Sequence, residues 1–99
     1  MTNHMRLPLM EPISSLSDVE FLAIYGNHWM RYTDSKRRLW MVTRQHYEAT
    51  VKPQPVAITV VELSTEQEQR IELPEFRNLI EQKLFIRLEK PLQIAFTIL

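Results

Sequence analysis

The clearest pattern in the chain is the apolar run PVAITVVEL at residues 55–63, which is rich in β-branched side chains. Such residues favour strands, and a run that is apolar at nearly every position is typical of a strand covered on both faces. The polar stretch STEQEQ follows at 64–69, and QRIEL at 69–73 then alternates between polar and apolar positions. We therefore predict a hairpin whose first strand lies centrally in a sheet.

The next segment has helical spacing. Phe76, Leu79, Ile80 and Leu84 fall on one stripe of a helix. Pro74 suits the first helical position, and the acid Glu75 and the base Lys83 suit the first and last turns, where they complement the helix dipole (residues read from LPEFRNLIEQKL). These signals predict a helix over residues 74–84.

A second, shorter helix is predicted near the start of the chain. Ser17 and Glu20 have the spacing of a capping box, and Gly26 with Asn27 ends the apolar segment. The pattern indicates a helix over residues 18–25. The alternative is a strand, because FLAIY at 21–25 is also a continuous apolar run. Residues 1–14 contain Pro8 and Pro12 and no periodicity, so we expect a loosely ordered arm before one domain over residues 15–99.

The last residues, FIRLEKPLQIAFTIL from 85 to 99, predict two strands around Glu89–Pro91. Together these elements give an α+β fold. We expect a single small domain with a bent antiparallel sheet of about five strands and the 74–84 helix packed on it. The predicted core comprises Met30, Tyr32, Leu39, Met41, Ile58, Val60, Ile71, Phe76, Leu79, Ile80, Ile94 and Phe96.

The stretch HWMRYTDSKRRLWMV at 28–42 predicts another hairpin, because TDSKRR has turn composition and its flanks resemble strands. With a two-residue turn at Ser35–Lys36, Tyr32 would lie opposite Leu39 on an apolar face. Arg31 would then lie opposite Trp40 on the other face. Both tryptophans and two arginines would share that second face, and a shift by one residue would abolish the separation.

Composition limits the classes of function. The chain has 99 residues, equal numbers of basic and acidic side chains, no cysteine and a single glycine. The missing cysteine excludes disulfides and thiolate chemistry, and one glycine excludes a glycine-rich phosphate loop. We also expect little backbone at positive φ. No apolar run is long enough to span a bilayer, and no signal peptide is visible, so we expect a cytoplasmic protein without a membrane partner.

The charge is unevenly distributed along the chain. Residues 28–52 hold six basic and two acidic side chains, whereas residues 62–81 hold six acidic and two basic ones. The two regions therefore have opposite net charges. They can neutralise each other in the fold, or they can present faces of opposite sign to partners.

The hairpin supplies the strongest binding candidate. We predict a site that consists of Trp29, Arg31, Lys36, Arg37, Arg38 and Trp40. Tryptophan and arginine dominate the energetics of protein interfaces, and the same residue types stack on bases and follow the backbone of single-stranded nucleic acid. The competing interpretation is that both tryptophans pack in a core under the arginine stems. Zero net charge favours a protein partner over nucleic acid.

Catalytic and metal sites have weaker support. His4, His28 and His46 show no metal-ligand spacing, so we predict no metal and no cofactor. His46, Glu48 and Arg44 would suit a small metal-independent ribonuclease, but a polar strand edge is the favoured explanation of these residues. We therefore expect a non-catalytic accessory or inhibitor protein that binds a protein or nucleoprotein partner, with homo-oligomerisation through a strand edge as a further expectation. The alternative is a small nucleic-acid-binding regulator that uses the same hairpin face.

Overall fold

The computed structural model describes residues 13–88. In chain order its elements are a short 3-10 helix at Ile13–Ser15, α1 at Asp18–Tyr25, β1 at Arg31–Asp34, β2 at Leu39–Tyr47, β3 at Pro55–Glu62, β4 at Gln67–Glu72, α2 at Leu73–Glu81 and β5 at Phe85–Leu88. The predicted second C-terminal strand lies outside the described residues, as do Ile94 and Phe96 of the predicted core.

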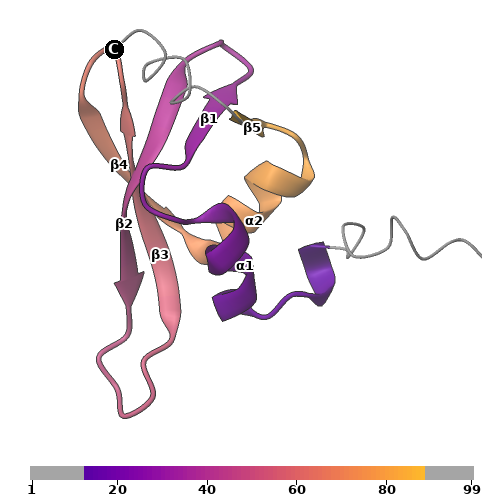
Figure 1. Ribbon diagram of the computed structural model, residues 1–99, viewed down its shortest axis with the longest axis vertical. Coiled ribbons are helices and arrows are strands. Elements are labelled where there is room, and N and C mark those ends of the chain that lie inside the picture. Colours follow the sequence, from indigo (N-terminus) through magenta and orange to yellow (C-terminus); the bar gives the residue numbers. More distant parts are fainter. Residues whose placement is uncertain (1–12, 89–99) are drawn as a thin grey trace, which may run out of the picture.

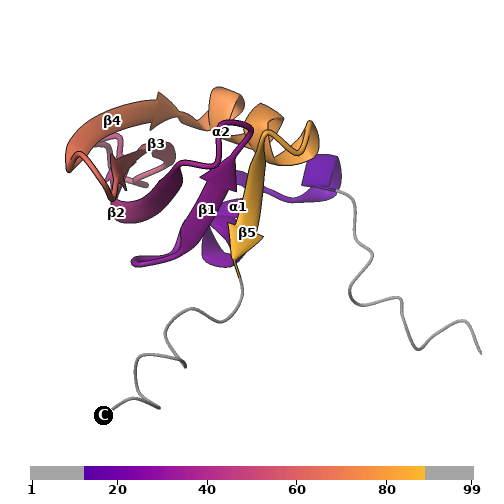
Figure 2. The same ribbon diagram turned by 90° about the horizontal axis from the view of Figure 1, so that it is seen from above.

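The five strands form one antiparallel sheet in the order β4-β3-β2-β1-β5. Both helices lie on the same side of this sheet, which curves around them (Figures 1 and 2). The predicted α+β class, with a five-stranded sheet and a helix packed on it, is confirmed. No helix within residues 13–88 is long and apolar enough to cross a lipid bilayer.

The core lies between the sheet and the helices. Phe21 and Leu22 of α1 and Phe76 of α2 pack there against Tyr32, and the aromatic ring centroids are 5–6 Å apart in the Phe21–Phe76 and Tyr32–Phe76 pairs (5.4 and 5.9 Å). The Tyr32 hydroxyl donates a hydrogen bond of 2.5 Å to the carbonyl of Tyr25, and burial raises the pKa of Tyr32. This bond satisfies the polar end of a fully buried ring and joins β1 to α1.

The capping box at the start of α1 forms as its spacing predicts. The Ser17 hydroxyl accepts from the Glu20 amide at 3.1 Å, and the Glu20 carboxylate accepts from the Ser17 amide at 2.8 Å. The helix ends at Gly26, whose φ is −115°, so this glycine does not serve as a left-handed cap. A Cβ at this position would lie 2.5 Å from Cδ2 of the buried Leu22, so the residue provides space instead.

The predicted helix over 74–84 forms but ends at Glu81. Lys83 adopts a φ of 59°, its amide donates to the carbonyl of Ile80 at 3.1 Å, and the amide of Leu84 donates to that of Leu79 at 2.9 Å. These two bonds form a Schellman motif with Lys83 at the position that glycine usually occupies. Lys83 therefore ends the helix and does not belong to its last turn.

Within residues 13–88, the few positions with positive φ are occupied by residues other than glycine: Trp29, Arg37, Glu66 and Lys83. Three of them lie in tight reversals, namely the β1–β2 turn, the β3–β4 turn and the end of α2. The sharp connections of this fold are thus made without glycine, at a cost in backbone strain of about 1 kcal/mol or more each.

The predicted register of the β1–β2 hairpin is wrong by one residue. Arg31 pairs with Met41, and Tyr32 pairs with Trp40. The loop contains three residues, because the Asp34 amide bonds to the Arg38 carbonyl at 3.1 Å and Arg37 adopts a φ of 65°. Such a loop adds one residue to the assumed two-residue turn, and a one-residue shift exchanges the two faces of a strand. Trp40 therefore points into the core.

The core prediction changes accordingly. Tyr32, Ile58, Val60, Ile71 and Phe76 are fully or almost fully buried, as predicted, and Met30, Leu79 and Ile80 pack partly buried against them. Leu39 is 41% exposed, and it shares with Met41 the sheet face opposite the helices. Trp40 and Val42 take the places in the core that the assumed register gave to these two residues.

A bulge in β2 changes which side chains face outward. Val42 pairs with Val60, but the next pair is Arg44 with Thr59, so Thr43 is the extra residue. Odd-numbered residues such as Met41 face away from the helices before the bulge, and even-numbered ones do so after it. Arg44 and His46 consequently share the face of Met41, and Gln45 turns inward, where its side-chain amide donates to the carbonyl of Gly26 at 2.7 Å.

Candidate functional site

The hairpin tip is organised by Asp34. Its carboxylate accepts from the backbone amides of Lys36 and Arg38 (both 2.9 Å), from Nε of Arg38 (2.8 Å) and from the indole Nε1 of Trp40 (3.0 Å). Burial by itself would raise the pKa of Asp34, but the hydrogen bonds from Trp40, Arg38 and Lys36 outweigh it and lower the pKa to about 2. The ionised carboxylate thus holds the turn and the buried indole together.

The six predicted site residues do not form one surface. Trp40 is 7% exposed, and Arg38 is tied to Asp34, with its guanidinium 5.4 Å from the centroid of the Trp40 ring. Trp29 is 57% exposed and lies before β1, where its ring contacts that of His28, with centroids 4.7 Å apart and planes tilted by 39°. The remaining three, Arg31, Lys36 and Arg37, belong to the face opposite the helices and to the hairpin tip.

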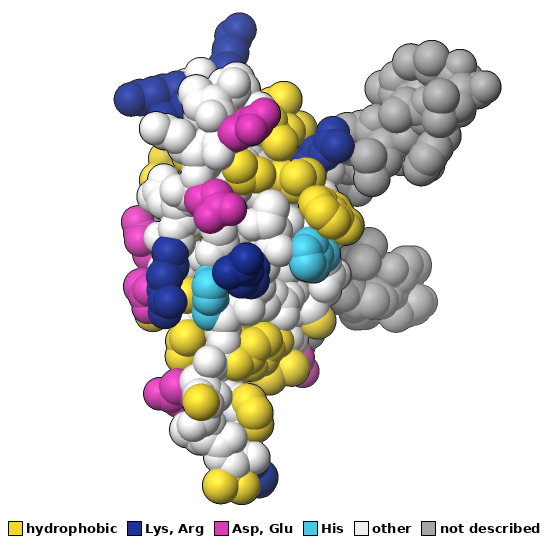
Figure 3. All heavy atoms as spheres, turned by 90° about the vertical axis from the view of Figure 1, so that its left-hand side faces the viewer, with side chains coloured by type: hydrophobic (Ala, Val, Ile, Leu, Met, Phe, Trp, Pro, Cys, Tyr) yellow, Lys and Arg dark blue, Asp and Glu magenta, His cyan; other side chains and the backbone are white. Residues whose placement is uncertain are grey.

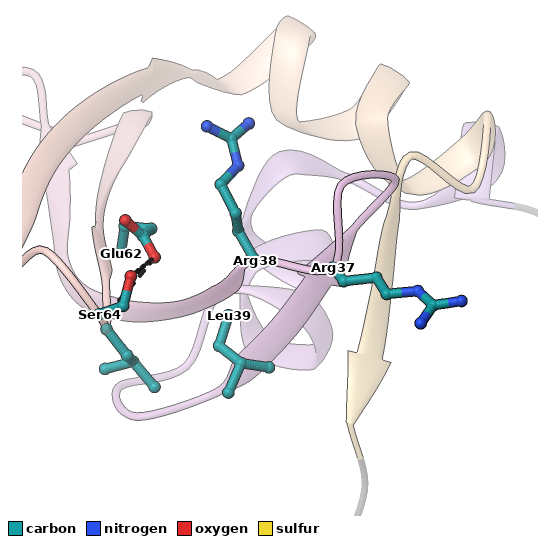
Figure 4. Close-up of a pocket in the computed structure, with 6 residues that line it drawn as sticks. Arg37, Arg38, Leu39, Glu62 and Ser64 are labelled. Carbon is teal, nitrogen blue, oxygen red and sulfur yellow. Dashed lines mark hydrogen bonds between the residues drawn. The ribbon is translucent and has the colours of Figure 1, made fainter.

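A shallow hollow of about 390 Å³ lies at the tip end of the sheet. Arg38 and Leu39 line it from β2 and its turn, and Glu62 and Ser64 line it from the β3–β4 turn; Arg37 projects away from Glu62 (Figure 4). Glu62 accepts from the hydroxyls of Ser64 and Thr65, and the bond from Ser64 is the main reason why its pKa is lowered. This acid therefore anchors the β3–β4 turn.

The sheet face opposite the helices, called here the open face, carries two distinct patches. No helix within residues 13–88 covers it (Figures 1 and 2). In the space-filling view onto this side, histidine and Lys or Arg side chains lie together in the middle, and hydrophobic side chains lie above and below them (Figure 3). The open face therefore combines apolar and basic chemistry.

The apolar patch follows from the strand register. Arg31 pairs with Met41 and Leu88, and Thr33 pairs with Leu39 and Ile86, so all of these face outward together. We define the apolar patch as Leu39, Met41, Val61, Ile86 and Leu88. Ile86 is 54% exposed. At the centre of the patch lies Arg31, whose Nε is buried and has no hydrogen-bond partner within the described part of the chain.

The basic patch lies beside it, beyond the bulge. Arg44, Thr59 and Arg70 form one cross-strand row over β2, β3 and β4, and His46 follows Arg44 on the same face. We define the basic patch as Arg44, His46 and Arg70. Nε2 of His46 lies 2.6 Å from Oγ1 of Thr59. Burial lowers the pKa of His46, and the positive charges of Arg70 and Arg44 lower it further.

Comparison of the chain with protein-family models, with curated proteins and with solved structures found no match. Among residues 13–88, no group of three His, Cys, Asp or Glu side chains is placed to hold a metal ion. Function must therefore be inferred from the open face itself.

Sequence reasoning missed Arg70 and Ile86 as surface candidates and misplaced Trp40. Arg70 lies 26 positions after Arg44, and only the pairing of β4 with β3 brings the two to one row. The polar–apolar alternation of QRIEL does indicate that Arg70 and Ile71 face opposite ways. The turn-forming residue Asp34 was visible in the sequence. It could not correct the position of Trp40, because an aspartate at the start of a turn is compatible with more than one loop length.

Proposed function

We propose that this protein is a non-catalytic docking module that binds another protein, or the protein part of a nucleoprotein assembly, through the apolar patch and Arg31. The observation that carries the proposal is the position of Arg31: a guanidinium with a buried, unpartnered Nε in the middle of exposed apolar side chains. A buried donor without an acceptor costs about 1–3 kcal/mol, and an acceptor oxygen from a partner would remove that cost.

The chemistry of the patch suits a protein surface. Contiguous exposed apolar side chains mark interaction sites, and arginine is one of the residues that contribute most to binding energy at interfaces. Lys36 and Arg37 are exposed at the adjacent hairpin tip, where they would attract a partner with acidic groups at its rim. We infer a partner that offers an apolar strip with a backbone carbonyl or carboxylate to meet Arg31.

The test uses two positions of nearly equal exposure on opposite sides of the molecule. Ile86 in the apolar patch is 54% exposed, and Val19 on α1 is 56% exposed. A photo-crosslinking amino acid is placed at either position in the full chain, in the cells that make it, and the crosslinked protein is identified by mass spectrometry. The identified protein is then purified, and its affinity for the wild-type chain is measured.

We expect capture from position 86 and not from position 19. With the purified partner, Ile86→Ser should weaken binding by about tenfold, because burial of one aliphatic side chain contributes about 1.5 kcal/mol or more, and Val19→Ser should leave it unchanged. Equal capture from both positions would contradict the proposal. A crosslink to a second copy of the chain would replace it by self-association, and one within the chain would show that the patch is covered internally.

A further inference from the structure

The basic patch carries an inference of its own, because its residues are brought together only by the sheet. Arg44 and Arg70 are two strands apart in one row, with the small Thr59 between them, so their Cα atoms are about 10 Å apart. The Thr43 bulge places Arg44 and His46 on the open face. Without that extra residue both would point toward the helices.

The positive charge of the patch is poorly neutralised. Arg44 is exposed, and none of the three ion pairs within residues 13–88 includes it. Arg70 donates Nε to Glu72 at 2.7 Å, but both side chains are more than half exposed (52% and 60%), and such a surface pair is weak. Arg70 therefore remains open to an incoming anion in spite of Glu72.

The His46 imidazole adds a hydrogen-bonding group between the two arginines. Burial lowers the pKa of His46, Arg70 and Arg44 lower it further, and Glu72 opposes them. The His46 ring contacts the Thr59 hydroxyl, so it is held in one orientation. An anion on this row would meet two guanidinium groups and an oriented polar ring.

An exposed aromatic ring lies next to the basic patch. A hollow of about 470 Å³ is lined by His28 and Arg44, among others. Trp29, which is 57% exposed, lies against the His28 ring, with centroids 4.7 Å apart and planes tilted by 39°. Tyr47 also borders the hollow, but its hydroxyl donates to Oε1 of Gln45 at 2.7 Å, on the other side of β2. Aromatic rings beside guanidinium groups suit single-stranded nucleic acid, because each unpaired base can stack on a ring and each phosphate can be neutralised by an arginine. Bases in a duplex are already stacked and cannot reach such rings.

We propose that the basic patch binds the phosphate backbone of a single-stranded nucleic acid, with Trp29 as a stacking surface for its bases. The site differs from the predicted hairpin face: Arg44, His46 and Arg70 take the places of Lys36, Arg37, Arg38 and Trp40. It is also separate from the apolar patch, so binding of nucleic acid does not depend on the proposed protein docking.

The experiment measures fluorescence anisotropy of a labelled oligo(dT) of about 20 nucleotides, and of a duplex of the same length, with the full chain. We expect oligo(dT) to bind more tightly than the duplex, and binding to weaken at least tenfold between about 50 and about 200 mM salt. Arg44→Gln and Arg70→Gln should each weaken binding several-fold, and Trp29→Ala should do so with little change in the salt dependence.

Two controls make the result specific. Lys83→Gln removes the same charge at the end of α2, and Ile86→Ser alters only the apolar patch; neither should change the affinity for oligo(dT). Circular dichroism checks that each variant is folded. The proposal is overturned if oligo(dT) does not bind at low salt, if Lys83→Gln weakens binding as much as Arg44→Gln, or if the duplex binds equally well and Trp29→Ala has no effect. Displacement of oligo(dT) by an equal charge of polyglutamate would instead identify an acidic protein segment as the ligand.

Discussion

The indole of Trp40 donates its Nε1 hydrogen to Oδ2 of Asp34 at 3.0 Å, the same carboxylate oxygen that receives Nε of Arg38 at 2.8 Å. This one oxygen holds two side chains of the basic–aromatic stretch, Arg38 and Trp40, in place. It binds the indole of the buried Trp40 and holds the guanidinium of Arg38 over the ring. Two residues that were predicted to bind a partner thus stabilise the hairpin instead. A buried tryptophan usually needs a partner for its indole N–H, and Asp34 supplies that partner to Trp40.

The Asp34 carboxylate should make stability depend on acid pH. Its pKa is lowered from 3.8 to about 2, so its contribution is complete above about pH 4 and is lost as the pH falls toward 2. We expect Asp34→Asn to lower the free energy of unfolding by about 1–2 kcal/mol at pH 7, because charged hydrogen bonds are lost. Urea denaturation at several pH values should show this difference shrinking below pH 4. Glu81→Gln, at an exposed position on α2, serves as the control and should show no such trend; a difference that is constant with pH would refute the role of the charge.

The two tryptophans should have different emission spectra. Trp29 is 57% exposed and Trp40 is 7% exposed. In Trp40→Phe, the remaining Trp29 should emit at long wavelength and be quenched readily by acrylamide, whereas in Trp29→Phe the remaining Trp40 should emit at shorter wavelength and be protected. Trp40→Ala should destabilise the fold by about 3–5 kcal/mol, and Trp29→Ala by less than about 0.5 kcal/mol. Equal quenching of the two single-tryptophan variants would show that the register of the hairpin is different.

The end of α2 offers a stabilising substitution. Lys83 occupies the left-handed position of a Schellman motif with a φ of 59°, where a residue without Cβ has no steric penalty. Lys83→Gly should therefore raise the free energy of unfolding by about 1 kcal/mol, net of the greater flexibility of the unfolded chain. Thermal denaturation measures the effect. Lys52→Gly, in the β2–β3 loop where φ is not positive, makes the same chemical change and should not stabilise.

Gly26, the only glycine of the chain, should not tolerate substitution even by alanine. In Gly26→Ala the new Cβ would lie 2.5 Å from Cδ2 of Leu22, which is 1% exposed and has little room to move. We expect a loss of about 1–3 kcal/mol from overpacking. A double-mutant cycle with Leu22→Ala tests the cause, since Gly26→Ala should cost much less once the leucine is shortened. Additive effects would place the strain elsewhere.

Much of the fold could be predicted because its signals are local. The capping box at Ser17, the proline near the start of α2 and the β-branched run of β3 each act through neighbouring residues. Such features have the same meaning in any tertiary context. They are sufficient to give the α+β class, the central position of β3 and the helix over 18–25.

The faces of the strands were decided by tertiary structure. The composition TDSKRR specifies a turn but not whether the loop has two or three residues. The third residue leaves Arg31 on the face away from the core, as predicted, but reverses the direction of Trp40. Likewise, no sequence signal next to Thr43 predicts the bulge in β2, although that bulge brings Arg44 and His46 to the open face.

The sequence by itself thus determined which segments become helices and strands, because backbone propensity, capping and hydrophobic period are properties of a few consecutive residues. Only the tertiary structure decided which charged and aromatic side chains meet on the open face. The side-chain period of a strand is two, so a single residue gained in a loop or bulge moves every later side chain to the other side of the sheet, and pairing across strands settles where that residue is gained.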